Sequence, residues 1–282
     1  MLWDIFPGSE HFGGAPANVA VHAAGLGAEA LMISAVGQDA RGDEALRRLA
    51  AFGVDCSAVA RLPDYPTGVV HVRIDAAGVP SYAIARGSAW DFIPWTAAVE
   101  RAARRADAIC FGTLAQTSAE SRATIRLAVA ATRATAWRLF DVNLRQNSYD
   151  ADVVVASLEL ANAVKLNEEE LPVVAGLCGL SSGSPVEQLR MLCERFELRL
   201  AALTQGPQGS VLVSADDVWR CSAPKTRVVD TVGAGDAFTA ALLVGILTGS
   251  SQNEANRRAN AVAAYVCSQQ GATPSIPRSL NP

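Results

Sequence analysis

The sequence has few residues of the kinds that build metal or redox sites. Its six cysteines are widely spaced, and no two of them form a Cys-x-x-Cys pair. The three histidines, His11, His22 and His71, are scattered, so a histidine-based metal site is not expected. Unpaired thiols are typical of proteins in a reducing compartment, and we expect a cytoplasmic protein.

Long runs of basic or apolar residues are also lacking. The net charge is −4 and no basic block stands out, so we expect neither a nucleic-acid partner nor an anionic membrane surface. The longest apolar stretch, Ala237–Leu247, is too short to cross a bilayer. Near the N-terminus, Asp4 and Glu10 occur without an early lysine or arginine, which argues against a secretory signal peptide.

Several common catalytic motifs are absent or occur in the wrong context. No Gly-Lys pair is present, which excludes a Walker A loop. Residues Gly179–Gly183 fit Gly-x-Ser-x-Gly, but every histidine lies upstream, so we reject a hydrolase. Residues Gly25–Ala30 fit a loose dinucleotide fingerprint, but they follow a helical pattern rather than a strand.

Short apolar runs alternate with helical patterns along most of the 282 residues. This alternation predicts an α/β protein with a parallel sheet covered by helices on both faces. No internal repeat or linker interrupts it, so we expect a single domain over residues 1–282. The predicted strands are Leu31–Val36, Ala108–Phe111, Trp137–Val142, Ala163–Leu166 and Leu200–Thr204. The predicted helices are Ala15–Leu26, Gly42–Phe52, Ser118–Ala134, Pro185–Phe196, Asp236–Leu247 and Asn253–Gln270.

Two segments interrupt the alternation with predicted β-hairpins. Val69–Ile74 and Pro80–Ala85 flank a turn at residues 75–78, with no helix between them. Such a hairpin is either a flap beside the main sheet, a dimer surface, or an edge pair without a role. Ser210–Ser214 and Val218–Cys221 predict a second hairpin.

A glycine-rich loop, Asp230–Phe238, is the most informative stretch. It follows a predicted strand, Arg227–Val229, and precedes a helix, so its small residues allow a tight turn at a helix N-terminus. Backbone N–H groups there favour an anion, and Asp236 at the same point can accept the proton of an attacking hydroxyl. We expect the helix N-terminus to keep Asp236 ionised. An ordinary tight turn with Asp236 as a helix cap is the alternative.

The loop Asp230–Phe238 resembles the second signature of the ribokinase-like (PfkB-type) carbohydrate kinases. Phe12–Ala20, followed by Leu26-Gly27 and Val36–Gly42, is similar to the first signature of that family. The resemblance covers nearly the whole chain. It implies a ribokinase-like three-layer α/β/α sheet with a small β lid, here the hairpin at about residues 66–92.

The resemblance also implies roles for individual residues. Asp236 matches the base that activates a sugar hydroxyl, and its loop matches the anion hole, at Gly233, Ala234 and Gly235. The positions that match sugar-contacting residues of the family are Asp4, Gly13, Gly14, Asn18, Gln116 and Arg145. Those that match the ATP side are Lys165, Asn167, Thr204, Gly206, Gly209 and Asn260.

Two acidic residues match metal positions of the family. Glu170 belongs to an Asn-x-x-Glu element that orders Mg²⁺ and its waters, and Asp230 lies where some members bind a monovalent cation such as K⁺. The resemblance therefore implies an ATP-dependent sugar kinase. The run Asp141–Arg145 favours fructose as the acceptor, with ribose, 2-keto-3-deoxygluconate and a nucleoside as alternatives. A non-catalytic sugar- or nucleotide-binding relative is the competing class, and a homodimer through the lid is the expected assembly.

The chain departs from the family pattern at its start. Family members carry a whole strand before the position of Asp4, whereas here Met1-Leu2-Trp3 precede it. Either the sequence as given starts late or that strand is lost, and in the chain as given we expect Asp4 to be poorly anchored. We also expect the hairpin to project from the main sheet over Asp4, Gly14 and Asn18.

Overall fold

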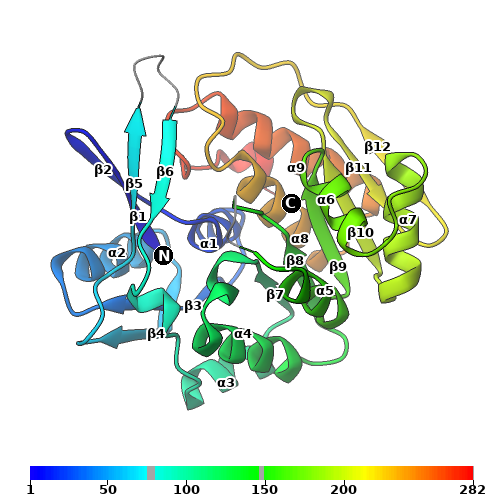
Figure 1. Cartoon of the computed structure of the whole chain (residues 1–282). Coiled ribbons are helices and arrows are strands. Elements are labelled where there is room, and N and C mark those ends of the chain that lie inside the picture. The colour runs from blue at the N-terminus through cyan, green and yellow to red at the C-terminus, as the bar shows by residue number, and fades with distance from the viewer. Residues whose placement is uncertain (75–79, 146–148, 282) are drawn as a thin grey trace.

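The computed structural model describes residues 1–74, 80–145 and 149–281 (Figure 1). Its largest sheet has six strands. The order of its strands is β12-β11-β10-β9-β8-β7. Strands β7 to β10 are parallel, and β11 and β12 are antiparallel to their neighbours. Their bounds are β7 Ala108–Phe111, β8 Trp137–Asp141, β9 Ala163–Asn167, β10 Leu200–Thr204, β11 Ser210–Val213 and β12 Val218–Cys221.

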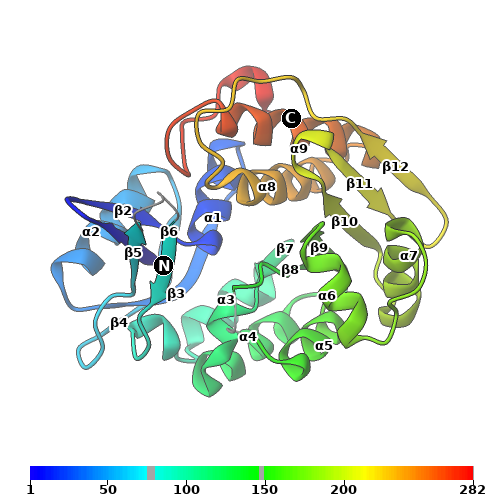
Figure 2. The same ribbon diagram turned by 45° about the horizontal axis from the view of Figure 1, so that its top comes forward.

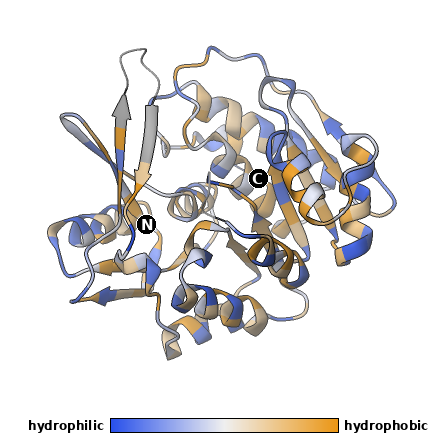
Figure 3. Ribbon diagram, viewed as in Figure 1, coloured by the Kyte–Doolittle hydropathy of each residue, from blue (hydrophilic) through white to orange (hydrophobic). Residues whose placement is uncertain are grey.

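Helices cover both faces of this sheet because successive side chains of each strand point to opposite faces. Leu139, Leu200 and Leu212 pack toward one face, which is covered by α1 (Ala15–Gly25), α8 (Ala234–Leu247) and α9 (Gln252–Cys267). The opposite face packs against α4 to α7. Their bounds are α4 Ala119–Ala131, α5 Ala151–Leu160, α6 Glu170–Leu177 and α7 Pro185–Phe196. Figure 2 shows the resulting three layers, and Figure 3 shows apolar residues concentrated where helices meet the sheet.

Two further sheets lie beside the six-stranded one (Figure 2). Strands β3 (Leu31–Gly37) and β4 (Asp55–Leu62) form a parallel pair joined by α2 (Ala40–Ala51). A four-stranded sheet has the order β2-β1-β5-β6. Its bounds are β1 Leu2–Phe6, β2 Ser9–Gly13, β5 Val69–Ile74 and β6 Pro80–Ile84. The remaining helix is α3, Ala97–Arg105, and the short 3₁₀ turns are η1 Ala89–Asp91, η2 Leu114–Thr117, η3 Gly206–Gln208 and η4 Arg278–Leu280.

The four-stranded sheet confirms one expectation about the lid and corrects another. The hairpin strands β5 and β6 form outside the main sheet, while the predicted turn at residues 75–78 lies outside the described residues. The expectation that Asp4 would be poorly anchored is wrong. Asp4 lies in β1, which pairs with β2 on one side and β5 on the other, so its backbone is fixed by two neighbours.

The predicted strand Arg227–Val229 is also wrong. These residues are extended but pair with no strand in the described part of the chain; Val228 and Val229 are 60% and 59% exposed. The backbone N–H of Val229 instead donates to the carbonyl of Cys267 at the end of α9, so this segment is held by a helix end rather than by a strand. Among the described residues, no helix is long and apolar enough to cross a membrane.

Candidate active site

One large cleft, of about 2710 Å³, opens where the carboxyl ends of β7 to β10 meet the N-termini of α1 and α8. Ligand sites of open α/β sheets lie at these strand ends. Sixteen of the eighteen residues expected in the site line this cleft: Asp4, Gly13, Gly14, Asn18, Arg145, Lys165, Asn167, Thr204, Gly206, Gly209, Asp230, Gly233, Ala234, Gly235, Asp236 and Asn260. The cleft therefore collects residues from both ends and the middle of the sequence.

The glycine loop is shaped by contact with the C-terminal segment. Gly233 has a φ of 79°, in the left-handed region, and a Cβ at this position would lie 2.3 Å from the carbonyl oxygen of Ala272. Only glycine fits both conditions. Helix α8 begins at the next residue, Ala234, so the first-turn N–H groups open toward the cleft. Such groups carry no partner within the helix and attract anions.

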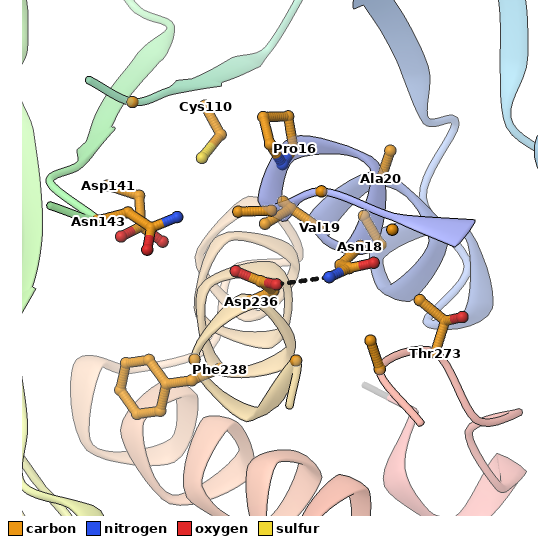
Figure 4. A pocket seen from close by; sticks show the side chains of 18 of the residues that line it. Pro16, Asn18, Val19, Ala20, Cys110, Asp141, Asn143, Asp236, Phe238 and Thr273 are labelled. Atoms are coloured by element: carbon orange, nitrogen blue, oxygen red, sulfur yellow. Dashed lines mark hydrogen bonds between the residues drawn. The ribbon is translucent and has the colours of Figure 1, made fainter. Parts of the chain in front are cut away.

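Asp236 and Asn18 face each other across the cleft (Figure 4). Nδ2 of Asn18 donates a 2.8 Å hydrogen bond to Oδ2 of Asp236. The other side-chain atom of Asn18, Oδ1, is buried without a hydrogen-bond partner in the described structure. A buried acceptor without a partner is costly, so this atom is suited to receive a donor from a bound ligand.

Burial raises the pKa of Asp236 to about 6. The hydrogen bond from Asn18 and the charges of Lys165 and Arg145 lower that pKa, while the nearby carboxylate of Asp141 raises it. The expectation that the helix N-terminus alone would decide the ionisation is therefore incomplete, because desolvation opposes it. A carboxyl group with a pKa near 6 is largely ionised at neutral pH yet accepts a proton readily.

A buried ion pair supports the floor of the cleft. Nζ of Lys165 lies 3.1 Å from Oδ1 of Asp141, whose other oxygen accepts a 2.8 Å hydrogen bond from Oγ1 of Thr239. Burial alone would lower the pKa of Lys165, but the carboxylates of Asp141, Glu170 and Asp236 outweigh it and raise that pKa. Lys165 therefore stays charged. A Cβ added at Gly235 would lie 3.2 Å from the Nζ of Lys165. This places the ammonium group directly beside the glycine loop.

The opposite end of the cleft is formed by β1, β2 and the start of α1. A Cβ at Gly13 would lie 3.6 Å from Oδ2 of Asp4 and 3.9 Å from Oδ1 of Asn18, so the glycine keeps space between two polar groups. Gly14 precedes α1 with a φ of 103°. Burial raises the pKa of Asp4, while His11 and Arg145 lower it. This end therefore presents the carboxylate of Asp4, the amide of Asn18 and the exposed guanidinium of Arg145.

A third group of residues lies around the ends of β9, β10 and β11. Gly209 has a φ of 103°, and a Cβ there would lie 2.0 Å from the carbonyl oxygen of Cys221, so glycine is required for the turn. Asn260 of α9 is buried, and its Nδ2 donates to Oγ of Ser210 at 2.6 Å. Asn167, Thr204 and Gly206 complete this side of the cleft.

Two expected site residues do not line the cleft. Gln116 is fully buried and donates from Nε2 to the carbonyl of Gly112 and to Oγ of Ser157, both at 2.9 Å. It fixes η2 against α5, so its prediction as a substrate-contacting residue is not supported. Glu170 is buried too, with each carboxylate oxygen accepting a backbone N–H, from Leu144 at 2.8 Å and Asn167 at 2.9 Å.

Asp230 lines the cleft but uses its carboxylate to hold the loop together. Oδ1 accepts the N–H of Val232 at 3.0 Å, and Oδ2 accepts the N–H of Gly271 at 3.0 Å. In the described part of the chain, no three acidic, cysteine or histidine side chains are grouped as a metal cage.

Sequence reasoning did not single out two residues that the structure brings into the cleft. Figure 4 shows Cys110 and Asn143 directed toward the space in front of Asp236. Asn143 has a positive φ of 41°, and burial raises the pKa of the Cys110 thiol well above its usual value. An isolated cysteine or asparagine carries no sequence signal of such a position.

Known proteins resemble this chain over almost its full length. The model of the pfkB family of carbohydrate kinases matches residues 7–279. A sugar kinase of Pyrococcus horikoshii is 32% identical over 98% of this chain and 87% of its own length. Its crystal structure with ATP has a TM-score of 0.81, with 96% of this chain and 91% of that chain covered.

Two other relatives differ in the substrate that their names state. A fructokinase of Klebsiella pneumoniae is 34% identical over 83% of this chain and 76% of its own length. An aminoimidazole riboside kinase of Salmonella typhimurium is 29% identical over 94% and 84%. Together with the ribokinase-like fold, the family match shows that the chain belongs to the PfkB family of carbohydrate kinases.

Proposed function

We propose that the protein transfers the γ-phosphate of ATP to a hydroxyl of a sugar, with Asp236 as the catalytic base. The observation that carries this proposal is the position of Asp236. It lies in the first turn of α8, directly after the glycine loop, and is hydrogen-bonded to Asn18. A proton acceptor and an anion-binding helix N-terminus thus lie at one point, as phosphoryl transfer to an alcohol requires.

In this reaction the acceptor hydroxyl gives its proton to Asp236 while its oxygen attacks the γ-phosphorus. The bond from that phosphorus to the bridging oxygen of ADP breaks, and ADP leaves with the electron pair. Asn18 holds the Asp236 carboxylate in position through the 2.8 Å hydrogen bond. The unpartnered Oδ1 of Asn18 then accepts a hydrogen bond from a sugar hydroxyl, and Asp4 accepts a second one.

The glycine loop and Lys165 bear the negative charge of the transferred group. The N–H of Ala234 donates to the carbonyl of Thr231 at 3.3 Å, so the first-turn N–H groups of Gly235 and Asp236 are the ones that we propose bind the phosphate. The helix dipole adds to their effect. Lys165 adds a full positive charge beside Gly235. Asp141 and Thr239 position that ammonium group rather than contact the substrate.

The cleft fits an Mg²⁺ ion that is held mostly by nucleotide phosphates and water. Mg²⁺ keeps several waters in most phosphate sites, and both Glu170 oxygens already accept backbone N–H groups. We propose that Glu170 acts on such waters indirectly by fixing the β9 end, where Glu168 and Glu169 line the cleft. When bound, the ion neutralises charge on the phosphates.

The nucleotide is proposed to lie between the ends of β9 to β11 and α9. Asn167, Thr204, Gly206, Gly209 and Asn260 supply this side of the cleft. Gly206 and Gly209 allow the backbone to approach a ligand closely because neither carries a side chain. Each carboxylate oxygen of Asp230 already accepts a hydrogen bond from a backbone N–H. A requirement for K⁺ at this position therefore stays a prediction. Turnover in KCl compared with an organic chloride salt measures it.

Fructose is the acceptor that we propose. Fructokinases from Klebsiella pneumoniae and Escherichia coli are 34% and 30% identical to the chain. Arg145, the last residue of the fructokinase-like run, lines the same cleft as Asp4, which supports this choice. The aminoimidazole riboside kinase keeps ribosides as the second candidate. Ribose, 2-keto-3-deoxygluconate and adenosine complete the panel of acceptors.

An ADP-release assay over this panel tests the proposal. We expect kcat/KM for fructose to exceed that of every other acceptor by at least about tenfold, or about 1.4 kcal/mol. If kcat/KM for a riboside is higher than for fructose by the same margin, the riboside becomes the assigned acceptor and the protein is still a kinase. ADP release with no acceptor, at rates above the Asp236→Asn variant, would instead indicate a binding protein with residual hydrolysis.

A homodimer through the lid also stays a prediction. The hairpin that forms the lid belongs to the four-stranded sheet, whose outer strands are β2 and β6. Neither strand has a strand partner on its outer side among the described residues. Unpaired strand edges are natural pairing surfaces. Light scattering across protein concentrations, with and without sugar, measures the assembly.

A further inference from the structure

The C-terminal segment that follows α9 packs against the glycine loop. A Cβ at Gly233 would lie 2.3 Å from the carbonyl oxygen and 2.8 Å from the Cα of Ala272, so the two backbones are in direct contact. Oδ2 of Asp230 also accepts the N–H of Gly271 at 3.0 Å. The conformation of the loop therefore depends on where the backbone of Gly271 and Ala272 is held.

His22 of α1 supplies a hydrogen bond that holds this backbone. Its Nε2 lies 2.9 Å from the carbonyl oxygen of Ala272, which is the same oxygen that a Cβ at Gly233 would meet first. Among the described residues, no backbone N–H donates to this carbonyl. Removing the imidazole would thus leave an acceptor without a partner directly beside the loop.

The donor in this hydrogen bond is His22. A main-chain carbonyl can only accept, so Nε2 carries the hydrogen, and in the neutral ring Nδ1 is an acceptor. Nδ1 is buried and has no partner in the described structure. Burial lowers the pKa of His22, while the bond to Ala272 raises it. The ring is therefore a neutral donor whose bond to the Ala272 carbonyl uses only one of its two nitrogens.

The surroundings of His22 make a histidine costly at this position. His22 is 1% exposed, and a buried polar atom without a partner, here Nδ1, costs free energy. With the exception of Asn18, the other buried residues of α1 are apolar: Ala17, Val19, Ala20 and Val21. A leucine would fill the space without leaving a nitrogen unpaired. The imidazole is therefore better explained by the carbonyl that it holds than by the stability of the core.

Asn18 and His22 lie four residues apart in α1 and so project from the same face of that helix. Asn18 donates to Asp236 in the first turn of α8, and α1 packs directly against α8. His22 donates to the segment that touches Gly233, the residue before α8. One face of α1 thus contacts both the proposed base and the support of the loop beside it.

We propose that His22 is a positioning residue for the glycine loop. Its Nε2–H holds the Ala272 carbonyl against Gly233, which fixes the start of α8 and directs the N–H groups of the first turn into the cleft. His22 does not itself line the cleft, so it acts through Ala272 and not on a substrate. The phosphate that these N–H groups bind belongs to the proposed phosphoryl transfer, on which this part of the inference rests.

Two substitutions of His22 test the hydrogen bond. His22→Leu keeps a side chain of similar size but removes the donor, whereas His22→Gln keeps an N–H group at the ε position. We expect amide hydrogen exchange of residues 233–236 to become faster in the leucine variant and to stay parental in the glutamine variant. This measurement needs neither sugar nor nucleotide.

Asn162→Leu is the matched control for the loss of a buried side-chain hydrogen bond. Nδ2 of Asn162 donates to the main-chain carbonyl of Ala136 at 2.8 Å. Asn162 directly precedes β9, whose opposite, carboxyl end lies at the cleft. This variant should lower the unfolding temperature and leave both kcat and the exchange of residues 233–236 unchanged.

Turnover separates positioning from a general loss of stability. We expect His22→Leu to lower kcat at least about tenfold, because the loss of a single donor to a developing negative charge costs about 10²–10³-fold. KM for the sugar should change less than about twofold, since Asp4 and Asn18 are intact. His22→Gln should restore kcat to within about threefold of the parent, because it keeps the donor.

Three results would overturn the proposal. Parental exchange of residues 233–236 in His22→Leu would show that the loop needs no support from this side chain. Equal losses in the leucine and glutamine variants would assign the effect to the shape of the ring, and a similar fall of kcat in Asn162→Leu would assign it to stability. If the leucine variant does not fold, the exchange rates of the glutamine variant decide, and faster exchange there counts against the proposal. A parent without sugar turnover would refute the proposed function alone, because the exchange experiment does not depend on it.

Discussion

Asn18 donates a 2.8 Å hydrogen bond to the catalytic-site carboxylate of Asp236, although 218 positions separate the two residues. The bond joins the first turn of α1 to the first turn of α8. The Asn18 amide therefore fixes the orientation of the buried Asp236 carboxylate. In the proposed reaction, Asn18 would couple substrate recognition to proton transfer.

Asp236→Asn should abolish most of the activity while keeping the fold. A positioned general base contributes about 10²–10⁴-fold, so we expect kcat to fall by at least about 100-fold, with little change in ATP affinity. Steady-state turnover and calorimetric ATP binding measure both quantities. Asp64→Asn, at an exposed position, is the matched control. Near-parental turnover of the Asp236 variant would remove this residue from the mechanism.

The pH dependence of kcat should report the ionisation of Asp236. Because the base acts when deprotonated and its pKa is about 6, activity should rise with pH through about 6. Asp141 raises this pKa and Lys165 lowers it, and the effect of Asp141 is the larger of the two. We suggest Lys165→Met together with Asp141→Asn, since Asp141 alone would remain as an unpaired buried charge. Removing both charges should therefore move the midpoint downward. A midpoint that moves upward would show that Lys165 influences the base more strongly than Asp141 does.

Stability should also depend on pH through Asp236. Its pKa is raised from 3.8 to about 6 in the folded state, so the protonated form favours folding. That contribution is complete below about pH 4 and is lost as the pH rises through about 6. Asp236→Asn should therefore raise the unfolding temperature at pH 8 and change it little at pH 4. A gain of equal size at both pH values would point to packing rather than to ionisation.

Replacing Asn18 by alanine should weaken both sugar binding and the base. The variant removes the donor to Asp236, which raises the pKa of that carboxyl, and it removes the free acceptor Oδ1. A neutral hydrogen bond such as that from a sugar hydroxyl to Oδ1 contributes about 0.5–1.5 kcal/mol, so we expect KM for the sugar to rise about two- to tenfold. Asn253→Ala, exposed on α9, is the control. An unchanged KM and an unchanged pH profile would contradict the role.

Gly233→Ala should be far more damaging than the same change at Gly249. Both glycines have a φ near 80°, but a Cβ at Gly233 meets the Ala272 backbone at 2.3 Å, whereas nothing lies within 4 Å at Gly249. The control should lose about 1 kcal/mol of unfolding free energy from the backbone alone. The Gly233 variant should lose more and lose activity with it. Denaturant titrations measure the free energy of unfolding of both variants. Equal losses would show that the Ala272 backbone moves away from the added Cβ at little cost.

The alternation of strands and helices was predictable because each element carries its own periodicity. Strands β7 and β10 and helix α7 have the predicted bounds. The strand predicted at Arg227–Val229 failed because an apolar run does not show whether a partner edge is free. Strand β1 was missed as a strand because its stability depends on pairing with β5, far along the chain.

The site was predictable wherever a motif carried it. The glycine loop and Asn18 lie in the cleft as expected, since their sequence patterns are long and specific. Gln116 lies outside the cleft, because a single polar residue in the sequence gives no sign of its burial against Ser157. The pairing of Lys165 with Asp141, whose other oxygen accepts a hydrogen bond from Thr239, was not foreseen, because these residues of β8, β9 and α8 meet only in the folded protein.

Helix α1 packs directly against α8, residues 15–25 against residues 234–247. A ribosome releases α1 first and α8 near the end of synthesis. For most of translation, then, the apolar side of α1 and one face of the growing sheet have no cover. Apolar surface that stays uncovered in this way favours aggregation, and a product cut short before α8 would also lack Asp236.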